Sequence, residues 1–97
     1  ISGLAAASVG KKLKLIAKKH QVICVTHLPS IAAMGDYHYF ISKEVIDQKT
    51  RTKVTRLSEE EAVQEIARIA SGVVTGIAIK HATELRNKMR QAVSSLS

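Results

Sequence analysis

His27 is the residue whose position most clearly suggests chemistry, because it follows a short apolar run. That run, residues 22–25, reads VICV and predicts a β-strand over residues 22–26 that is buried on both faces. In parallel α/β sheets, ligands bind just beyond the carboxyl ends of such strands, which is where His27 stands. An imidazole there can hydrogen-bond a phosphate oxygen or an attacking water, although it can also cap the turn. On the residues alone, both roles stay open.

Zinc binding is a weaker interpretation of the same region. His20, Cys24 and His27 are four and three residues apart, a spacing that groups ligands on a helix but not on the expected strand. The sequence has one cysteine and therefore no CxxC pair. Cys24 is instead expected to be an inert core thiol, and His20, His38 and His81 to be surface or packing residues. No metal site is predicted.

Motifs of a complete catalytic site are missing from the sequence. It contains no Walker A sequence, no GxGxxG and no serine in a GxSxG elbow, so the chain by itself is expected to hydrolyse nothing. Its 97 residues suit one unit over residues 1–97, and the 45% hydrophobic content excludes a disordered tail. No run approaches the roughly 20 apolar residues that span a bilayer. A single cysteine is compatible with a reducing cytoplasm.

The net charge of +7 is unevenly distributed along the chain. Residues 1–57 carry ten Lys and Arg against three acidic residues, whereas residues 58–97 carry five of each. Such a field favours a polyanion such as DNA or nucleotide phosphate, but it also describes a solvated lysine-rich surface. Lys49, Arg51 and Lys53 are the DNA-binding candidates. The aromatic residues all fall within one short segment, which gives little support to base stacking.

Periodicity predicts a helix before the apolar strand. Residues 4–19 place Val9, Leu13 and Ile16 on one helical face, and Gly10 indicates a close contact. A helix that leads directly into a doubly buried strand is half of a βαβ unit, which implies a parallel sheet in an α/β fold.

A short helix and a β-hairpin are expected next. Pro29 suits the first position of a helix, and the short helix is expected over residues 31–34. Residues 37–46 and 50–57 alternate like strands and are joined by a hairpin turn at residues 47–49. The second strand has no strongly apolar face, so it is expected to lie at an exposed edge.

Two amphipathic helices are expected at the end of the chain. Ser58 forms a capping box with Glu61, and the helix continues to about Ser71, with Gly72 as its stop. The last helix starts near Thr75. The residues expected to face inward are Ala62, Val63, Ile66, Ala67 and Ile69 in the first helix and Ala78, Ala82, Leu85, Met89 and Ala92 in the second.

Residues 26–39, which read THLPSIAAMGDYHY, resemble the switch-histidine segment of the RecN family, typically THLPQVAAxADxHY. Residues 1–3, ISG, resemble the end of the family's DxGISG sequence, which forms the D-loop. Weaker matches in residues 43–68 and beyond extend the resemblance over essentially the whole chain. Leu4 and Gly35 depart from the family pattern, and neither change touches the histidine.

The RecN family is similar to the SMC and ABC ATPases, whose head assembles from both ends of a chain with a long coiled coil between them. The resemblance implies that this chain is the C-terminal part of a P-loop ATPase head with an incomplete parallel sheet. It further implies that two heads sandwich ATP and Mg²⁺. The implied partners are the N-terminal part of the same head, a second head copy and DNA, in the bacterial cytoplasm at the nucleoid.

By that analogy, His27 contacts the γ-phosphate or the attacking water, and Ser2 and Gly3 belong to a D-loop at the dimer interface. The implied function is ATP-driven DNA repair and recombination at double-strand breaks after DNA damage, with activity only in the full-length protein. The alternative is a free-standing basic nucleic-acid-binding domain without nucleotide chemistry, which leaves the turn at His27 unexplained. The apolar strand needs neighbours that this chain lacks, so the chain alone is expected to self-associate.

Overall fold

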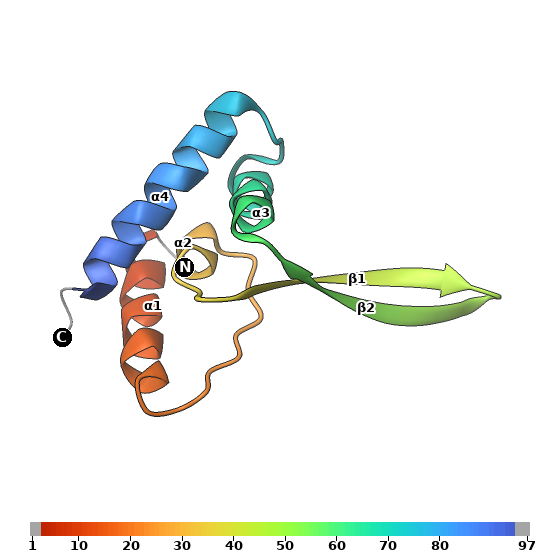
Figure 1. Ribbon diagram of the computed structural model, residues 1–97, viewed down its shortest axis with the longest axis horizontal. Helices are drawn as coiled ribbons and strands as arrows, with labels where there is room; N and C mark the ends of the chain where they lie inside the picture. The colour runs from red at the N-terminus through yellow and green to blue at the C-terminus, as the bar shows by residue number, and fades with distance from the viewer. Residues whose placement is uncertain (1–2, 95–97) are drawn as a thin grey trace.

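The computed structural model describes the backbone of residues 3–94 and the side chains of residues 5–92. The fold is mixed α/β, with helices packed together and a β-hairpin that projects from them as an arm (Figure 1). The elements are α1 (Gly3–Ala17), α2 (Pro29–Ala32), β1 (His38–Ile46), β2 (Lys49–Leu57), α3 (Glu59–Ser71) and α4 (Gly76–Ser94).

The hairpin follows from its turn and from its alternating residues. Asp47 and Gln48 form a two-residue loop with φ values of 52° and 64°, which matches the right-handed twist of the flanking strands. Antiparallel pairing runs from this loop back to His38, which lies opposite Leu57. β2 is exposed along its length except at Leu57. The predicted hairpin and its exposed second strand are therefore confirmed.

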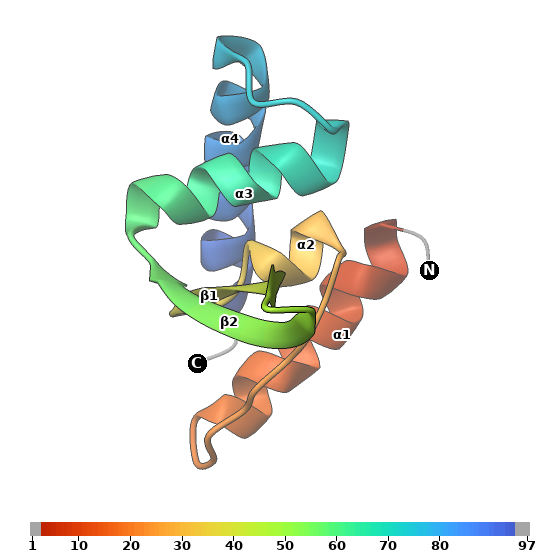
Figure 2. The ribbon, with the colours of Figure 1, turned by 90° about the vertical axis from the view of Figure 1, so that its right-hand side faces the viewer.

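The core lies where α3, α4 and the segment around α2 meet. Figure 2 shows α3 lying across α4, with α2 between α3 and α1. The Ser58 hydroxyl accepts a hydrogen bond from the Glu61 amide at 3.1 Å, and the Glu61 carboxylate accepts one from the Ser58 amide at 2.9 Å. This confirms the predicted capping box, and Gly72 ends α3 in the left-handed region with a φ of 78°, as predicted. The core residues are Ala33, Met34, Ile66, Ala67, Ala78, Ala82 and Met89.

α1 packs through small residues, which corrects the apolar face predicted for it. Ala6 and Gly10 are buried, whereas Val9 and Ile16 are exposed. A Cβ atom at Gly10 would lie 2.2 Å from the Sδ atom of Met34, so the absence of a side chain allows α1 to approach the core. This confirms the close contact expected at Gly10. It also explains the correction, because turning the glycine inward leaves the Val9 and Ile16 face outside.

Residues 22–26 do not form the predicted buried strand. Residues 21–28 form a loop with neither helix nor strand, and Ile23 and Val25 are 84% and 82% exposed. Cys24 is exposed too, so the expectation of an inert core thiol is wrong. A strand needs a neighbour for its backbone N–H and C=O groups. Within residues 3–94 the sheet consists of the antiparallel β1–β2 pair, so the expected parallel sheet is not formed there.

Among the described residues, no single helix is long and apolar enough to cross a bilayer, and α3 and α4 reach the threshold only as a pair bent by 105°.

Candidate functional site

His27 lies near the end of the loop that joins α1 to α2, and its side chain is exposed. The Thr26 hydroxyl accepts a hydrogen bond from the Leu28 amide at 3.0 Å, which closes a small turn around His27. Pro29 then begins α2, at a position where its missing N–H group leaves no hydrogen bond unmade. The sequence therefore presents an imidazole on an ordered turn, where it can hydrogen-bond a ligand from outside the chain.

The far end of α2 is held by side chains from two other elements. α2 spans one turn, and its last carbonyl groups lack partners inside the helix. His38, the first residue of β1, places its Nε2 atom 2.5 Å from the carbonyl oxygen of Ala32. A carbonyl can only accept, so this nitrogen carries the proton. Arg86 of α4 donates from Nη1 to the carbonyls of Ala33 and Gly35, at 2.9 and 3.1 Å.

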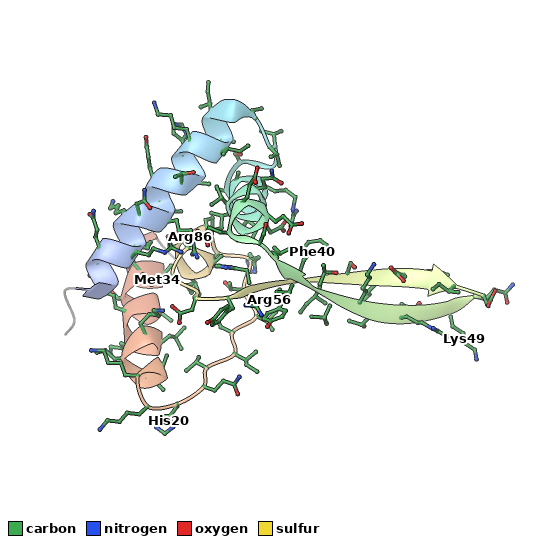
Figure 3. The ribbon with its side chains drawn as sticks, viewed as in Figure 1. His20, Met34, Phe40, Lys49, Arg56 and Arg86 are labelled. Carbon is green, nitrogen blue, oxygen red and sulfur yellow. The ribbon has the colours of Figure 1, made fainter. Side chains whose placement is uncertain are left out.

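Arg86 is a fully buried charge, with 1% of its surface exposed, and Figure 3 shows it directed from α4 toward α2. Its Nε and Nη2 atoms donate to the two carboxylate oxygens of Glu59, the first residue of α3, at 2.5 and 2.9 Å. This hydrogen-bonded guanidinium holds the pKa of Glu59 below its ordinary value. Arg90, one turn later, also donates to Glu59 at 3.2 Å. One arginine thus connects α4, α3 and the end of α2.

Arg86 is not among the site residues predicted from the sequence, although its spacing carries a signal. Arg86 comes four residues after Ala82 and three before Met89, so a helix places it on the same face as these inward residues. A charge on such a face is rarely buried without a partner. The sequence does not show which groups bind Arg86, because Glu59 and the carbonyls after α2 are distant from it along the chain.

The DNA-binding candidates Lys49, Arg51 and Lys53 lie at alternate positions of β2, and therefore on one face of the arm. All three are exposed, and Figure 3 shows Lys49 at the tip of the arm. The Nζ atom of Lys53 lies 3.6 Å from a carboxylate oxygen of Glu44, an exposed ion pair that contributes little to stability. The arm presents a basic ribbon to the solvent.

Of the two remaining predicted site residues, only Gly3 lies among those that the structure describes. Gly3 is the first residue of α1, and Ser2 lies outside the described residues. The start of α1 and the end of the His27 loop both lie beside α2 in Figures 1 and 2, whereas the arm points away from them. His20 and His81 are exposed. No group of three or more His, Cys, Asp or Glu side chains in the described part of the chain could hold a metal ion.

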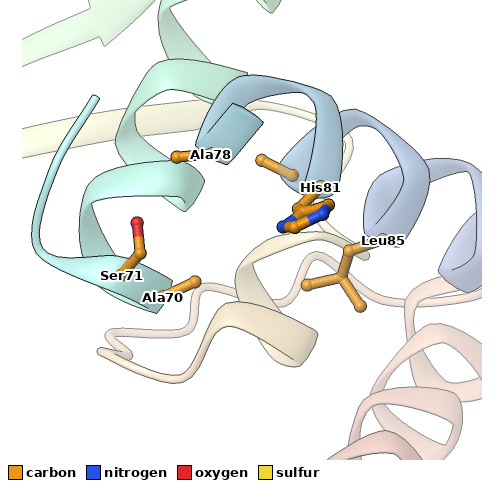
Figure 4. A pocket seen from close by; sticks show the side chains of 6 residues that line it. Ala70, Ser71, Ala78, His81 and Leu85 are labelled. Carbon is orange, nitrogen blue, oxygen red and sulfur yellow. The ribbon is translucent and has the colours of Figure 1, made fainter. Parts of the chain in front are cut away.

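A small hollow lies between α3 and α4 (Figure 4). Its volume is about 210 Å³, and its lining residues are Ala70, Ser71, Ala78, His81, Ala82 and Leu85. Small-molecule sites usually enclose roughly 300–1,000 Å³. The hollow is smaller than such sites and mainly apolar, so it does not fit a nucleotide.

Known proteins are similar to nearly the whole chain, although no protein-family model matches it. DNA repair protein RecN of Bacillus subtilis (strain 168) is 42% identical over 92 residues, which is 94% of this chain and 16% of that protein. DNA repair protein RecN of Deinococcus radiodurans is 42% identical over 85 residues, 88% of this chain and 15% of that protein. In Xylella fastidiosa (strain 9a5c), RecN is 47% identical over 73 residues, 75% of this chain and 13% of that protein.

The chain belongs to the RecN family. An alignment over 92 of 97 residues necessarily includes the His27 loop, the hairpin arm and Arg86. The chain nevertheless spans only 13–16% of the length of these RecN proteins. The RecN similarity therefore applies to the segment that holds the His27 loop and Arg86.

Proposed function

We propose that this RecN-family chain forms part of the P-loop head of an SMC/ABC-type ATPase that acts in DNA repair. In this proposal His27 contacts the γ-phosphate of ATP or the attacking water. The observation that supports it is the exposed imidazole on an ordered turn, inside a segment similar to DNA repair proteins across 94% of the chain. Recombination and action at double-strand breaks belong to the same proposal.

The chain supplies one edge of such a site. The sequence has no Walker A motif, and the described residues offer an imidazole rather than a phosphate-cradling loop. They therefore fit a single contact with a triphosphate and not a whole nucleotide. ATP supplies the phosphoryl group and Mg²⁺ neutralises its charge when both are bound. The N-terminal part of the head and a second head copy would supply the other contacts, with Ser2 and Gly3 at the interface between copies.

His27 itself would hydrogen-bond an oxygen whose charge grows as the phosphoryl group transfers. Such a contact acts by positioning and electrostatics, because phosphoryl transfer needs little covalent help from the protein. The turn made by Thr26 and Leu28 would keep the imidazole in place before ATP arrives. This preorganisation reduces the reorganisation that the reaction requires.

The test is His27→Ala in the full-length protein, with His20→Ala as the matched control because His20 is also exposed but precedes the loop. We expect ATP hydrolysis to slow by about 10²–10³-fold, as when one preorganised hydrogen bond is removed, while ATP affinity changes much less. Steady-state hydrolysis and nucleotide binding are measured on the same preparations. Unchanged turnover in His27→Ala would leave the residue as a turn component only.

The hairpin arm favours DNA as the polyanion that this region contacts. A two-stranded antiparallel ribbon fits the DNA major groove, which is about 12 Å wide, and β2 exposes Lys49, Arg51 and Lys53. Replacing these three residues by glutamine should weaken binding equally across sequences. The slope of log affinity against log salt should become shallower by roughly 0.9 for each DNA phosphate that the arm no longer neutralises.

The control for the arm is Lys80→Gln with Lys88→Gln, which removes exposed charges from α4 instead. An unchanged salt slope in the arm variant would show that its charges are only solvated. The same measurements address the alternative function. A free-standing nucleic-acid-binding domain without nucleotide chemistry predicts DNA binding by the arm and no ATP turnover for His27→Ala to reduce.

A further inference from the structure

The segment that carries His27 cannot hold its position through its own interactions. α2 has four residues, far fewer than the roughly 12–15 that a helix needs for stability by itself in water. The loop before it, residues 21–28, has neither helix nor strand. The location of this segment must therefore depend on the contacts that other elements make with α2 and the residues after it.

Arg86 contributes two hydrogen bonds to these contacts. Its two bonds to the carbonyls of Ala33 and Gly35 satisfy backbone groups just beyond α2. Its other donors are occupied by Glu59, and no buried side-chain nitrogen or oxygen in the described residues lacks a partner. A planar guanidinium that donates hydrogen bonds in several directions fixes both the distance and the orientation of the groups that it binds.

A series of hydrogen bonds leads from these carbonyls back to His27. Along α2 and its caps, the amide of Ala32 donates to the carbonyl of Leu28 at 3.0 Å, and the amide of Ala33 donates to the carbonyl of Pro29 at 2.8 Å. The Leu28 amide in turn bonds to Thr26 on the other side of His27. Each link is a hydrogen bond of ordinary length, so a displacement at Ala33 moves the turn around His27 as well.

We propose that Arg86 is the positioning residue of the His27 loop, and that it sets the imidazole in place for its ligand by anchoring the end of α2 to α3 and α4. The proposal rests on the proposed function of His27. It differs from a purely structural role, because two of the arginine's bonds go to the backbone after α2 rather than to its ion-pair partner. Glu59 is the second component, since it directs the guanidinium fork toward these carbonyls.

Arg86→Lys in the full-length protein is the principal test. Lysine keeps the charge but presents one ammonium group, which cannot make the fork and both carbonyl bonds together. We expect kcat for ATP hydrolysis to fall by about 10- to 100-fold, as for a small misplacement of a catalytic group, with KM for ATP nearly unchanged. Hydrogen exchange of the backbone amides in residues 26–35 should accelerate by roughly 10-fold or more.

Two further variants separate positioning from folding. Arg90→Gln is the matched control, because Arg90 also contacts Glu59 but is half exposed and makes none of the carbonyl bonds. It should change neither kcat nor exchange in residues 26–35. Glu59→Gln keeps the buried arginine but replaces one carboxylate oxygen by an NH2 donor, so it loses the ion pair and one of the two hydrogen bonds from Arg86. Glu59→Gln should lower kcat and accelerate exchange in residues 26–35 by less than Arg86→Lys does. If Arg86→Lys does not fold, Glu59→Gln becomes the test in its place.

The outcomes distinguish this proposal from the function on which it rests. If Arg86→Lys is folded and matches Arg90→Gln in both kcat and local exchange, the positioning role of Arg86 is wrong even when His27→Ala is slow. If His27→Ala keeps full turnover, the proposed function is wrong. Faster exchange of residues 26–35 in Arg86→Lys would then still show that the arginine holds the loop, but without a catalytic consequence.

Discussion

Similar apolar side chains lie in different surroundings in two regions of the molecule. One region is the helical layer, formed by α2, α3 and α4, and the other is the hairpin arm. Ile66 of α3 is 1% exposed, whereas Ile41, Val45 and Val54 of the arm remain exposed. The strand register puts these three arm residues on one face. That face has no second layer over it in the described chain, and a two-stranded hairpin contributes little stability by itself. Apolar residues form a core here only where another element closes over them.

The two regions also differ in how they use charge. In the helical layer, Arg86 is buried and its donors are directed at Glu59 and two carbonyls. On the arm, Lys53 and Glu44 are 3.6 Å apart and exposed. Removing one partner of a buried pair is costly, whereas exposed pairs contribute roughly 0–1 kcal/mol. The charged groups of the helical layer therefore fix the relative positions of its elements, and those of the arm remain available to bind a partner.

The largest expected effect concerns the reaction rate of the Cys24 thiol, because the loop of residues 21–28 is exposed like the arm. In this chain, Cys24 should react with an aromatic disulfide reagent at nearly the rate measured after unfolding in urea. A thiol in a buried strand would be protected by more than about 100-fold. A rate that rises by that factor on unfolding would show that residues 22–26 are covered after all.

Truncation of a core residue should separate the layer from the arm energetically. Ile66→Ala is expected to lower the free energy of unfolding by about 3 kcal/mol, since it leaves a cavity in the core. Val54→Ala on the arm should change it by less than about 0.5 kcal/mol. Urea unfolding of the two variants measures both values. Equal losses would mean that the arm contributes to the core, contrary to its exposure.

The capping box should make a smaller contribution to the same layer. Ser58→Ala removes one cap hydrogen bond from the start of α3 and is expected to cost about 1 kcal/mol. Ser8→Ala, an exposed position within α1, is the control and should cost nothing. A neutral Ser58→Ala would indicate that packing, and not the cap, determines where α3 begins.

Acid should destabilise the layer slightly through Glu59. Its pKa is lowered in the folded state by the hydrogen bonds from Arg86, so the folded protein releases this proton more readily than the unfolded one. The resulting stabilisation is complete above the ordinary carboxyl pKa of about 4.3 and is lost as pH falls through the lowered value. Glu59 is half exposed, so the effect is small. Urea midpoints measured across this range should vary less with pH in Glu59→Gln than in the parent chain, and equal slopes would contradict the assignment.

The elements that could be predicted from the sequence are those with local causes. The capping box of Ser58 and Glu61 and the left-handed Gly72 bound α3 through interactions within four residues. The hairpin turn likewise depends on neighbouring residues. Such features need no knowledge of the rest of the fold.

The features that could not be predicted depend on distant partners. Residues 22–26 have the composition of a buried strand, but no strand lies beside them in the described residues. The inward face of α1 is set by Met34 against Gly10, and the partners of Arg86 come from other elements. His27 was identified from its place after an apolar run and by resemblance, and its role as a nucleotide contact is still a proposal.

A double-mutant cycle between His27 and Arg86 tests most directly whether the anchored layer acts through the exposed loop. In the full-length protein, turnover is measured for His27→Ala, Arg86→Lys and the double variant, with each rate expressed per folded molecule. If Arg86 acts by placing His27, the double variant should hydrolyse ATP as slowly as His27→Ala alone, because the arginine has no imidazole left to position. If turnover in the double variant falls by the product of the two single-variant reductions, the account is contradicted. That result would mean that Arg86 affects turnover independently of His27.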